Sequence, residues 1–385
     1  MISELLAQLA AATVLAAGQL GAGAATLAEQ DPPADQGAPA AALAELSLPQ
    51  RVGQLFMVGT PAGQADQRTR AQIRTHHVGS VMLTGRSYTG TAAPREVSRS
   101  MRSAVSRPAT GNVRLFVATD QEGGQVRVLQ GPGFSDNPSA LVQGGWRPAD
   151  LRRAAHRWAD QLHDVGVNMN LAPVLDTVPS PEVAQDNPPI GSFDRQFGYT
   201  TPVVSRHGVA FQRGMEDGGV VPTAKHFPGL GRVSANTDTA AGVTDRVTRR
   251  HDPYLRPFRA AIDAGAPVVM MSTAYYEHLD PDRPAAFSPF VIGRMLRGDL
   301  GFDGVVISDD LAEAKQVASY PPADRAVLFL RAGGDLVLTV DPGPLPAMRD
   351  AVLRRARTND AFRAKVDAAA LRVLRAKHEQ GLLPR

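Results

Sequence analysis

Cysteine is absent from all 385 residues of this sequence. Without thiols the chain can form no disulfide, no thiolate metal site and no cysteine nucleophile. The histidines form no HxxxH or HxH pair, so the common spacing of paired imidazole ligands is missing too. We therefore expect no thiolate or paired-imidazole metal site, and any chemistry must rest on carboxylates, lysine, arginine and single histidines. Separately, we expect that the protein requires no metal and no organic cofactor.

Concentrated positive charge is also lacking. The 41 Lys and Arg residues nearly balance the 38 Asp and Glu residues, and the formal net charge is +3. The basic residues are spread along the chain and are not interleaved with aromatic residues, whereas nucleic-acid binding needs a basic patch. We expect no nucleic-acid partner. With 43% hydrophobic and 21% charged residues, the composition is typical of a globular protein with a sizeable core.

The N-terminus has no long hydrophobic run. Its first 30 residues are rich in Ala, but Glu4 and Gln8 stand where a secretory signal would carry Lys or Arg. The segment is too short and polar for a stable membrane span. An export signal and a solvated helix both remain open, which leaves the location uncertain, with secretion or the cell envelope slightly favoured over the cytoplasm. Pro and Ala then mark a linker, so we expect a signal-like segment and linker over 1–47 and one domain over 48–385.

Eight short β-branched apolar runs alternate with longer amphipathic stretches along this domain. In one such stretch, apolar residues from Leu151 to Leu162 recur at helical spacing. The eight predicted strands are 55–59, 80–85, 115–120, 167–176, 220–227, 267–274, 304–310 and 336–340. Alternation of strand and helix predicts a parallel sheet. Eight units, with no GxGxxG turn after an early strand, favour a single α/β domain of the (β/α)8 (TIM) barrel type over an open sheet.

Charged residues end four of the predicted strands, and active sites of (β/α)8 barrels lie at these ends. The four clusters are Asp120-Gln121-Glu122, Asp176, Lys225-His226 and Ser308-Asp309-Asp310. Such residues also cap helices or face water, but four clusters on one rim indicate a site. Carboxylates with one Lys and one His favour acid/base or nucleophilic chemistry on a polar, uncharged substrate such as a sugar.

A retaining glycosidase needs two carboxyl groups about 5 Å apart, one to attack the anomeric carbon and one to protonate the leaving oxygen. Asp309 and Asp310 cannot both play these roles, because successive strand residues point to opposite faces. We expect one of them to face the site and the other to cap the next helix or bond the backbone.

Several segments resemble, in order, the barrel domain of glycoside hydrolase family 3, and most of all its bacterial β-N-acetylhexosaminidase branch. They are VGQLFMVG, ATDQEGGQVRVL, GVNMNLAPVLD, IGSFDRQFGY, AKHFPGLG, PAAFSPFVIGRMLRGDLGFDGVVISDDL and AGGDLVL. The resemblance runs from about Val52 to Leu338. It implies a retaining hydrolase, expected to be a monomer, that releases β-linked N-acetylglucosamine from cell-wall-type glycans, as in peptidoglycan recycling.

The resemblance also implies residue roles. The first Asp of SDD, Asp309, corresponds to the family's nucleophile. The residues that correspond to its sugar ligands are Asp120, Arg195, Lys225 and His226. Carboxylates accept hydroxyl protons and cationic side chains donate in fixed directions, so the chemistry suits each role. Two alternatives stay open: Arg195 could be a structural partner of Asp194 or Asp176, and His226 could be buried and only hydrogen-bonded.

The sequence departs from the family after KHFPG. The hexosaminidase branch carries a mobile loop ending in an Asp-Ser-His-like triplet, whose His is the acid/base, but this chain places Asn236, Thr237 and Asp238 there. We expect Asp238 to be the acid, with its pKa raised when the Gly-rich loop closes.

Two alternatives to this role of Asp238 remain. The acid could come from Asp120, Glu122 or Glu277, or be unnecessary for good leaving groups. Otherwise the barrel could bind glycan fragments with weakened catalysis.

A second departure concerns the substrate. The family commonly has EGGRVxR where this chain has EGGQVRVL, so Gln125 replaces an Arg that could pair with a lactyl carboxylate of muramic acid. A β-glucosidase is a further alternative. Those members usually carry SDW at the nucleophile and a second large α/β domain, whereas this chain has SDD, so we favour the hexosaminidase branch.

Overall fold

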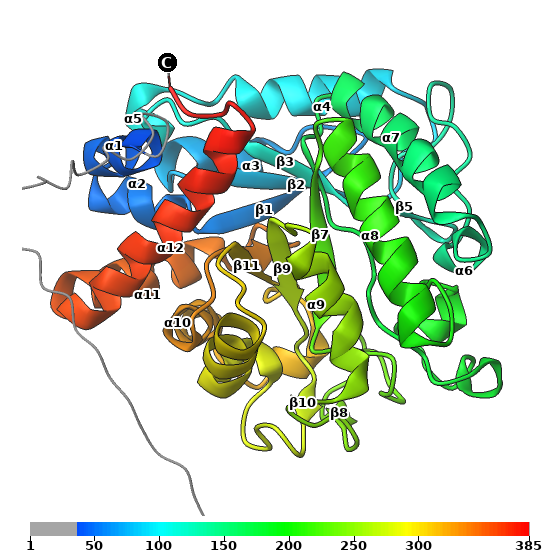
Figure 1. The fold of residues 1–385 in the computed structure, drawn as a ribbon. Coiled ribbons are helices and arrows are strands. Elements are labelled where there is room, and N and C mark those ends of the chain that lie inside the picture. Colours follow the sequence, from blue (N-terminus) through cyan, green and yellow to red (C-terminus); the bar gives the residue numbers. More distant parts are fainter. Residues whose placement is uncertain (1–36, 385) are drawn as a thin grey trace, which may run out of the picture.

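The computed structural model describes residues 37–384, so the signal-like segment at the N-terminus lies outside the described residues (Figure 1). Eight strands form one parallel sheet in the order β11-β9-β7-β6-β3-β2-β1-β12. A bridge between Ile307 and Leu336 joins the two outer strands of this order and closes the barrel. The strands are β1 (Phe56–Pro61), β2 (Ser80–Thr84), β3 (Phe116–Thr119), β6 (Met169–Asn170), β7 (Val221–Phe227), β9 (Val268–Met271), β11 (Val305–Ser308) and β12 (Val337–Thr339). Seven of them lie within a predicted run, and β1 overlaps its run but extends two residues further, to Pro61. The eight parallel strands confirm the (β/α)8 barrel.

Helices alternate with the strands and surround the barrel (Figure 1). They are α3 (Gln67–Thr75), α4 (Ala92–Arg102), α7 (Pro148–Asp164), α8 (Thr201–Asp217), α9 (Arg256–Asp263), η5 (Phe290–Asp299), α10 (Pro322–Ala332) and α11 (Leu345–Thr358). In α7 the predicted apolar stripe is buried. It meets α8 through Trp158 and Phe211, whose ring centroids are 6.2 Å apart. Helical periodicity in the sequence therefore located α7 correctly.

Short elements fill the connections. The helical ones are α2 (Leu48–Gly53), α5 (Arg107–Thr110), α6 (Ala140–Gln143), η1 (Pro181–Val183), η2 (Gly191–Phe193), η3 (Pro253–Leu255), η4 (Ala285–Phe287) and η6 (Lys315–Val317). Two small pairs of strands extend the loops after the barrel strands: β4 (Gln121–Gly123) with β5 (Val126–Arg127), and β8 (Thr244–Asp245) with β10 (Tyr275–Tyr276).

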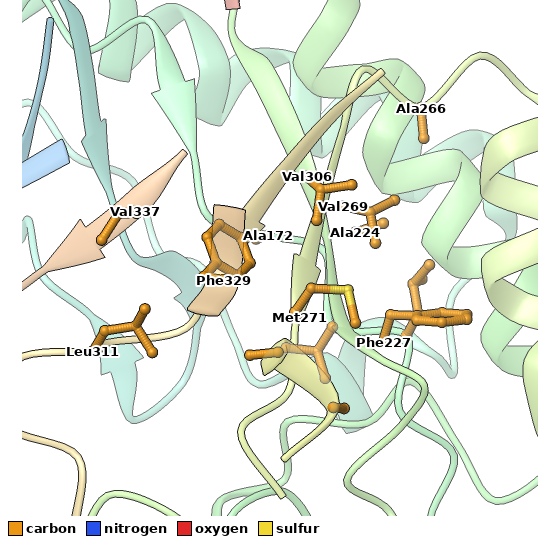
Figure 2. Packing of buried hydrophobic residues seen from close by; sticks show 14 of the residues in the cluster. Ala172, Ala224, Phe227, Ala266, Val269, Met271, Val306, Leu311, Phe329 and Val337 are labelled. Carbon is orange, nitrogen blue, oxygen red and sulfur yellow. The ribbon is translucent and has the colours of Figure 1, made fainter. Parts of the chain in front are cut away.

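The core has two layers, because successive strand residues face opposite sides of the sheet. In β1, Met57 belongs to the cluster inside the barrel, whereas Phe56 and Val58 join the cluster between sheet and helices. Figure 2 shows part of this outer layer, where Val306 and Val269 of neighbouring strands lie near Phe329 of α10. The double layer fixes which strand-end residues face the barrel axis.

Helix α12 (Asp360–Glu379) covers the amino ends of the strands. Its Val373 and Ala376 join the cluster inside the barrel. The wholly buried Lys377 donates from Nζ to Gln54 Oε1 and to the carbonyl oxygen of Gly79, both at 2.7 Å. These acceptors immediately precede β1 and β2. The interior of the barrel is thus closed at this end.

Helix α1 (Gly37–Glu45) packs against α12. Leu46, just after it, is buried with Val113, Leu374 and Leu383. The last part of the expected linker is therefore helical and packed, while the domain boundary at residue 48 stays a prediction. None of the helices within residues 37–384 is sufficiently long and apolar to cross a membrane.

Candidate active site

A cavity of about 560 Å³ opens at the carboxyl ends of the barrel strands, within the range of small-molecule sites. Its walls combine apolar residues from inside the barrel, such as Leu171 and Met270, with charged residues from the strand ends. All six residues predicted for the site line it: Asp120, Arg195, Lys225, His226, Asp238 and Asp309. The structure therefore brings together residues that span about half of the sequence.

Lys225 lies between two carboxylates at the end of β7. Its Nζ is 2.6 Å from Asp120 Oδ1 and 2.6 Å from Glu122 Oε1. Burial alone would lower the pKa of Lys225, but the charges of Asp120 and Glu122 outweigh burial and raise it. The pairing of β7 with β9 is irregular between Ala224 and Phe227. This irregularity interrupts the usual alternation of side chains, and both Lys225 and His226 line the cavity.

Arg195 makes a bidentate ion pair with Glu122. Its Nε and Nη2 donate to the two carboxylate oxygens at 2.8 and 2.7 Å, and Nη1 donates to the carbonyl oxygen of Pro189 at 2.7 Å. Burial would raise the pKa of Glu122, but Arg195 and Lys225 together lower it to about 2. Glu122 is therefore ionised and unsuited to be the general acid. The carboxylate partner of Arg195 is Glu122 rather than Asp194 or Asp176, and Arg195 still lines the cavity.

His226 is oriented by Asp176, which stands at the end of the fourth predicted strand. Nδ1 of His226 is 2.7 Å from Asp176 Oδ2. The other oxygen of this fully buried carboxylate accepts the backbone N–H groups of His226 at 3.3 Å and Leu230 at 2.7 Å. We assign the ring proton to Nδ1 because the carboxylate is an acceptor, which leaves Nε2 toward Arg195, 3.4 Å away. His226 is thus both hydrogen-bonded and available to the cavity.

Asp309 and Asp310 follow β11 and have different surroundings. Asp310 accepts the backbone N–H groups of Ala312 at 3.0 Å, Glu313 at 2.9 Å and Val340 at 2.9 Å. Asp309 accepts one, from Asp310, at 2.8 Å. Asp310 therefore has the backbone-bonding role expected for one member of the pair, and Asp309 is the carboxylate less engaged with the backbone.

Asp238 lies on the loop after β7 and lines the same cavity as Asp309. The residue is exposed to the open cavity. Partial desolvation of its carboxyl group by the surrounding cavity walls, together with the charge of Asp309, raises the pKa of this group to about 6. Arg195 and His226 act in the opposite direction without cancelling this effect. A carboxyl group with this pKa can hold a proton near neutral pH, as a general acid requires.

Other residues considered from the sequence lie elsewhere. Glu277 pairs with Arg246 at 3.4 Å and is not among the described residues that line the cavity. Arg127 pairs with Asp136 at 3.1 Å. Its neighbour Val126 lines the cavity. Within residues 37–384, no group of three or more His, Cys, Asp and Glu side chains is placed to hold a metal ion.

The comparisons with known proteins define the class. Residues 47–376 match the family model of the glycosyl hydrolase family 3 N terminal domain. The chain therefore belongs to glycoside hydrolase family 3, as its motifs indicated. It is a glycosidase built on one (β/α)8 barrel, and its substrate is a carbohydrate.

Individual relatives show which members of the family this chain resembles. A β-hexosaminidase of Stenotrophomonas maltophilia strain K279a is 31% identical over 327 residues, which are 82% of this chain and 92% of that protein. The crystal structure of a β-N-acetylhexosaminidase from Beutenbergia cavernae DSM 12333 is 54% identical, with a TM-score of 0.85, and the match covers 86% of this chain and 98% of that one. A family 3 β-N-acetylglucosaminidase from Paenibacillus sp. str. FPU-7 is 32% identical with a TM-score of 0.81, over 88% of this chain and 64% of that one.

Proposed function

We propose that the protein is a retaining β-N-acetylhexosaminidase in which Asp309 is the nucleophile and Asp238 the acid/base. The observation that carries the proposal is that these two carboxyl groups share one cavity, where the charge of Asp309 helps to keep Asp238 protonated. Asp309 attacks the anomeric carbon while Asp238 protonates the departing glycosidic oxygen. The products of this step are the free leaving group and a sugar esterified to Asp309.

The second step reverses the role of Asp238. Once Asp309 is an ester its negative charge is gone, and the pKa of Asp238 falls because like-charge repulsion contributed to raising it. Asp238, now a carboxylate, takes a proton from water, whose oxygen attacks the anomeric carbon and releases Asp309. Two inversions at that carbon give net retention.

Four residues bind the sugar in this proposal. Asp120 accepts hydroxyl protons, and Lys225, Arg195 and His226 provide further polar contacts beside it. Hydrogen bonds to charged groups contribute about 1.5–3 kcal/mol each. Glu122 and Asp176 stand behind them, hold the cations and the imidazole in place, and so reduce the ordering needed when a sugar binds.

The sugar that we propose is β-linked N-acetylglucosamine, since relatives that match most of this chain are named β-hexosaminidase and β-N-acetylhexosaminidase. Cell-wall-type glycans are the proposed source. The enzyme is proposed to act as a monomer, without a cofactor and without nucleic acid. The missing Asp-Ser-His triplet supports one rival, a barrel that binds glycan fragments with little turnover.

Asp238→Ala tests the proposal. The variant should lose far more activity on a disaccharide of N-acetylglucosamine than on its p-nitrophenyl glycoside, since only the poor leaving group needs a proton. Added azide should rescue the aryl reaction and give a glycosyl azide of retained configuration. Equal losses on both substrates would reject Asp238 as the acid. A wild-type protein that binds N-acetylglucosamine but hydrolyses no glycoside would favour the rival.

A further inference from the structure

The loop that carries Asp238 is joined to the segment that follows the nucleophile. Gln316, 2% exposed, uses both ends of its amide on one residue: Oε1 accepts the Val243 N–H at 2.9 Å and Nε2 donates to the Val243 carbonyl at 3.0 Å. The backbone continues the contact, because the N–H of Gln316 donates to Thr237 O at 3.0 Å and that of Lys315 to Asp238 O at 3.2 Å.

The same loop is held at its beginning as well. The buried Asn187 donates from Nδ2 to the carbonyl oxygens of Leu230 at 2.8 Å and Val233 at 2.7 Å. The hydroxyl of Tyr276 donates to the carbonyl of Gly229 at 2.8 Å. The loop is therefore hydrogen-bonded to distant parts of the chain on both sides of Asp238.

The chain between nucleophile and anchor is short and itself restrained. Six residues after Asp309 the chain reaches Lys315, and within this stretch Asp310 accepts the N–H groups of Ala312 and Glu313. The acid's loop is therefore docked on the segment that begins at the nucleophile. A shift of Gln316 would change the separation of the two carboxyl groups, on which protonation of the leaving oxygen depends.

We propose that Gln316 is a positioning residue, which holds Asp238 at working distance from Asp309 before a substrate binds. The inference rests on the proposed role of Asp238 as the acid. A glutamine suits this place because it supplies one donor and one acceptor to a single backbone residue. An apolar residue would leave the buried N–H and C=O of Val243 without that partner.

A pair of variants at Lys315 tests the docking with little change to the fold. Lys315→Pro removes the N–H that bonds to Asp238 O, and proline is tolerated at the first position of a helical turn, here η6. The preceding Ala314 has an extended backbone, φ −54° and ψ 122°, as a residue before proline requires. Lys315→Ala is the matched control, because it removes the same exposed side chain and keeps the N–H.

Lys315→Pro should lower kcat on the disaccharide by about five-fold and leave the p-nitrophenyl glycoside nearly unaffected. Lys315→Ala should match the wild type on both. Gln316→Met, which keeps the length of the side chain, should lower kcat on the disaccharide by about ten-fold or more and again leave the p-nitrophenyl glycoside nearly unaffected. In both variants the alkaline limb of the pH profile should move to lower pH, because Asp238 is then farther from the charge of Asp309.

Gln50→Met controls for stability, since Gln50 is a buried glutamine at the closed end of the barrel that bonds the carbonyl of Arg107 at 2.9 Å. It should lower the Tm, and any loss of activity should be equal on the disaccharide and the p-nitrophenyl glycoside. If Lys315→Pro and Gln316→Met lose activity equally on both substrates, or keep the wild-type pH profile, the positioning role is rejected. If Asp238→Ala loses activity equally on both substrates, the proposed role of Asp238 as the acid, on which the positioning role rests, is rejected instead.

Discussion

Burial in the cavity and the charge of Asp309 raise the pKa of the Asp238 carboxyl group to about 6, so its proposed role as the acid can be tested in a pH profile. The acid must be protonated when the glycosidic bond breaks. Because this pKa is that of the free enzyme, we expect kcat/KM for the disaccharide to fall as pH rises above about 6, roughly ten-fold per pH unit on the alkaline limb. The p-nitrophenyl glycoside should show a shallower decline. Parallel profiles for the two substrates would contradict this assignment.

Asp309→Asn keeps the size of the side chain but removes the charge needed to attack the anomeric carbon. Turnover should fall by at least about a thousand-fold, while calorimetry should still detect binding of N-acetylglucosamine and the Tm should stay close to the wild-type value. A 2-fluoro glycoside should label the wild type at Asp309, as read by peptide mass spectrometry. A label on another residue would reject the nucleophile.

Glu122 contributes stability through its contacts with Arg195 and Lys225, which lower its pKa from 4.5 to about 2. Because the folded state holds this proton more weakly than the unfolded state, the contribution is full above pH 4.5 and is lost as pH falls toward 2. Its size is up to roughly 3 kcal/mol. Urea unfolding of Glu122→Gln should therefore show a weaker loss of stability between pH 4.5 and 3 than the wild type.

The same variant should weaken binding of N-acetylglucosamine by about ten-fold, because Arg195 and Lys225 lose the carboxylate that orients them. Unchanged affinity would mean that Asp120 alone fixes Lys225. The sequence placed the proposed sugar ligands in the site but placed Glu122 only among candidate acids. Its role depends on two cations more than 70 residues away, and no local pattern carries that information.

At the scale of elements, the loop after β7 differs most from what its sequence indicates. GLGRVSANTDT has few apolar residues, which predicts a mobile segment. Its anchors are instead the side chains of Asn187 and Gln316, contributed by other loops. Hydrogen bonds between distant loops leave no periodic signal in the sequence. Helix α7 was predictable because its buried residues recur at every turn of the helix.

Helix α12 carries an unusual pH dependence. Burial lowers the pKa of Lys377 to about 7, and its acceptors on Gln54 and Gly79 are uncharged. Between pH 7 and 10.5 the unfolded chain binds more protons here than the folded one, so stability contributed by this group rises with pH. The slope should reach about 1.4 kcal/mol per pH unit. Chemical denaturation of Lys377→Met at pH 7 and 9 should show a smaller difference than the wild type, and an equal difference would contradict this account.

For the whole molecule, the eight strands and their closure into a parallel barrel followed from the alternation of apolar runs with amphipathic stretches. This pattern is strong because each barrel strand is buried on both faces. The cavity walls were less predictable. Phe193 and Pro189 line the cavity from an irregular connection after β6, where neither strand nor helix periodicity applies.

Two truncations test how the molecule is organised. A protein that lacks residues 1–36 keeps α1 and Leu46 and serves as the reference. Deleting residues 1–46 should lower the Tm by roughly 5 °C, since it removes the packing of Leu46 against Leu374 and Leu383. Equal Tm values for the two truncated proteins would show that α1 adds nothing to the fold.

The closed end of the barrel also bears on how the enzyme can be attached to a surface. Ala38 and Pro384, near the two ends of the described chain, line one groove at that end, away from the cavity. A resin coupled there would leave the cavity at the carboxyl ends of the strands open to solvent. The sequence has four lysines, and Lys225 and Lys377 are buried. Amine-reactive beads can then reach Lys365 on α12 and Lys315 beside the acid's loop, so Lys315→Arg would direct side-chain coupling to α12 and keep the immobilised enzyme open to long glycan chains.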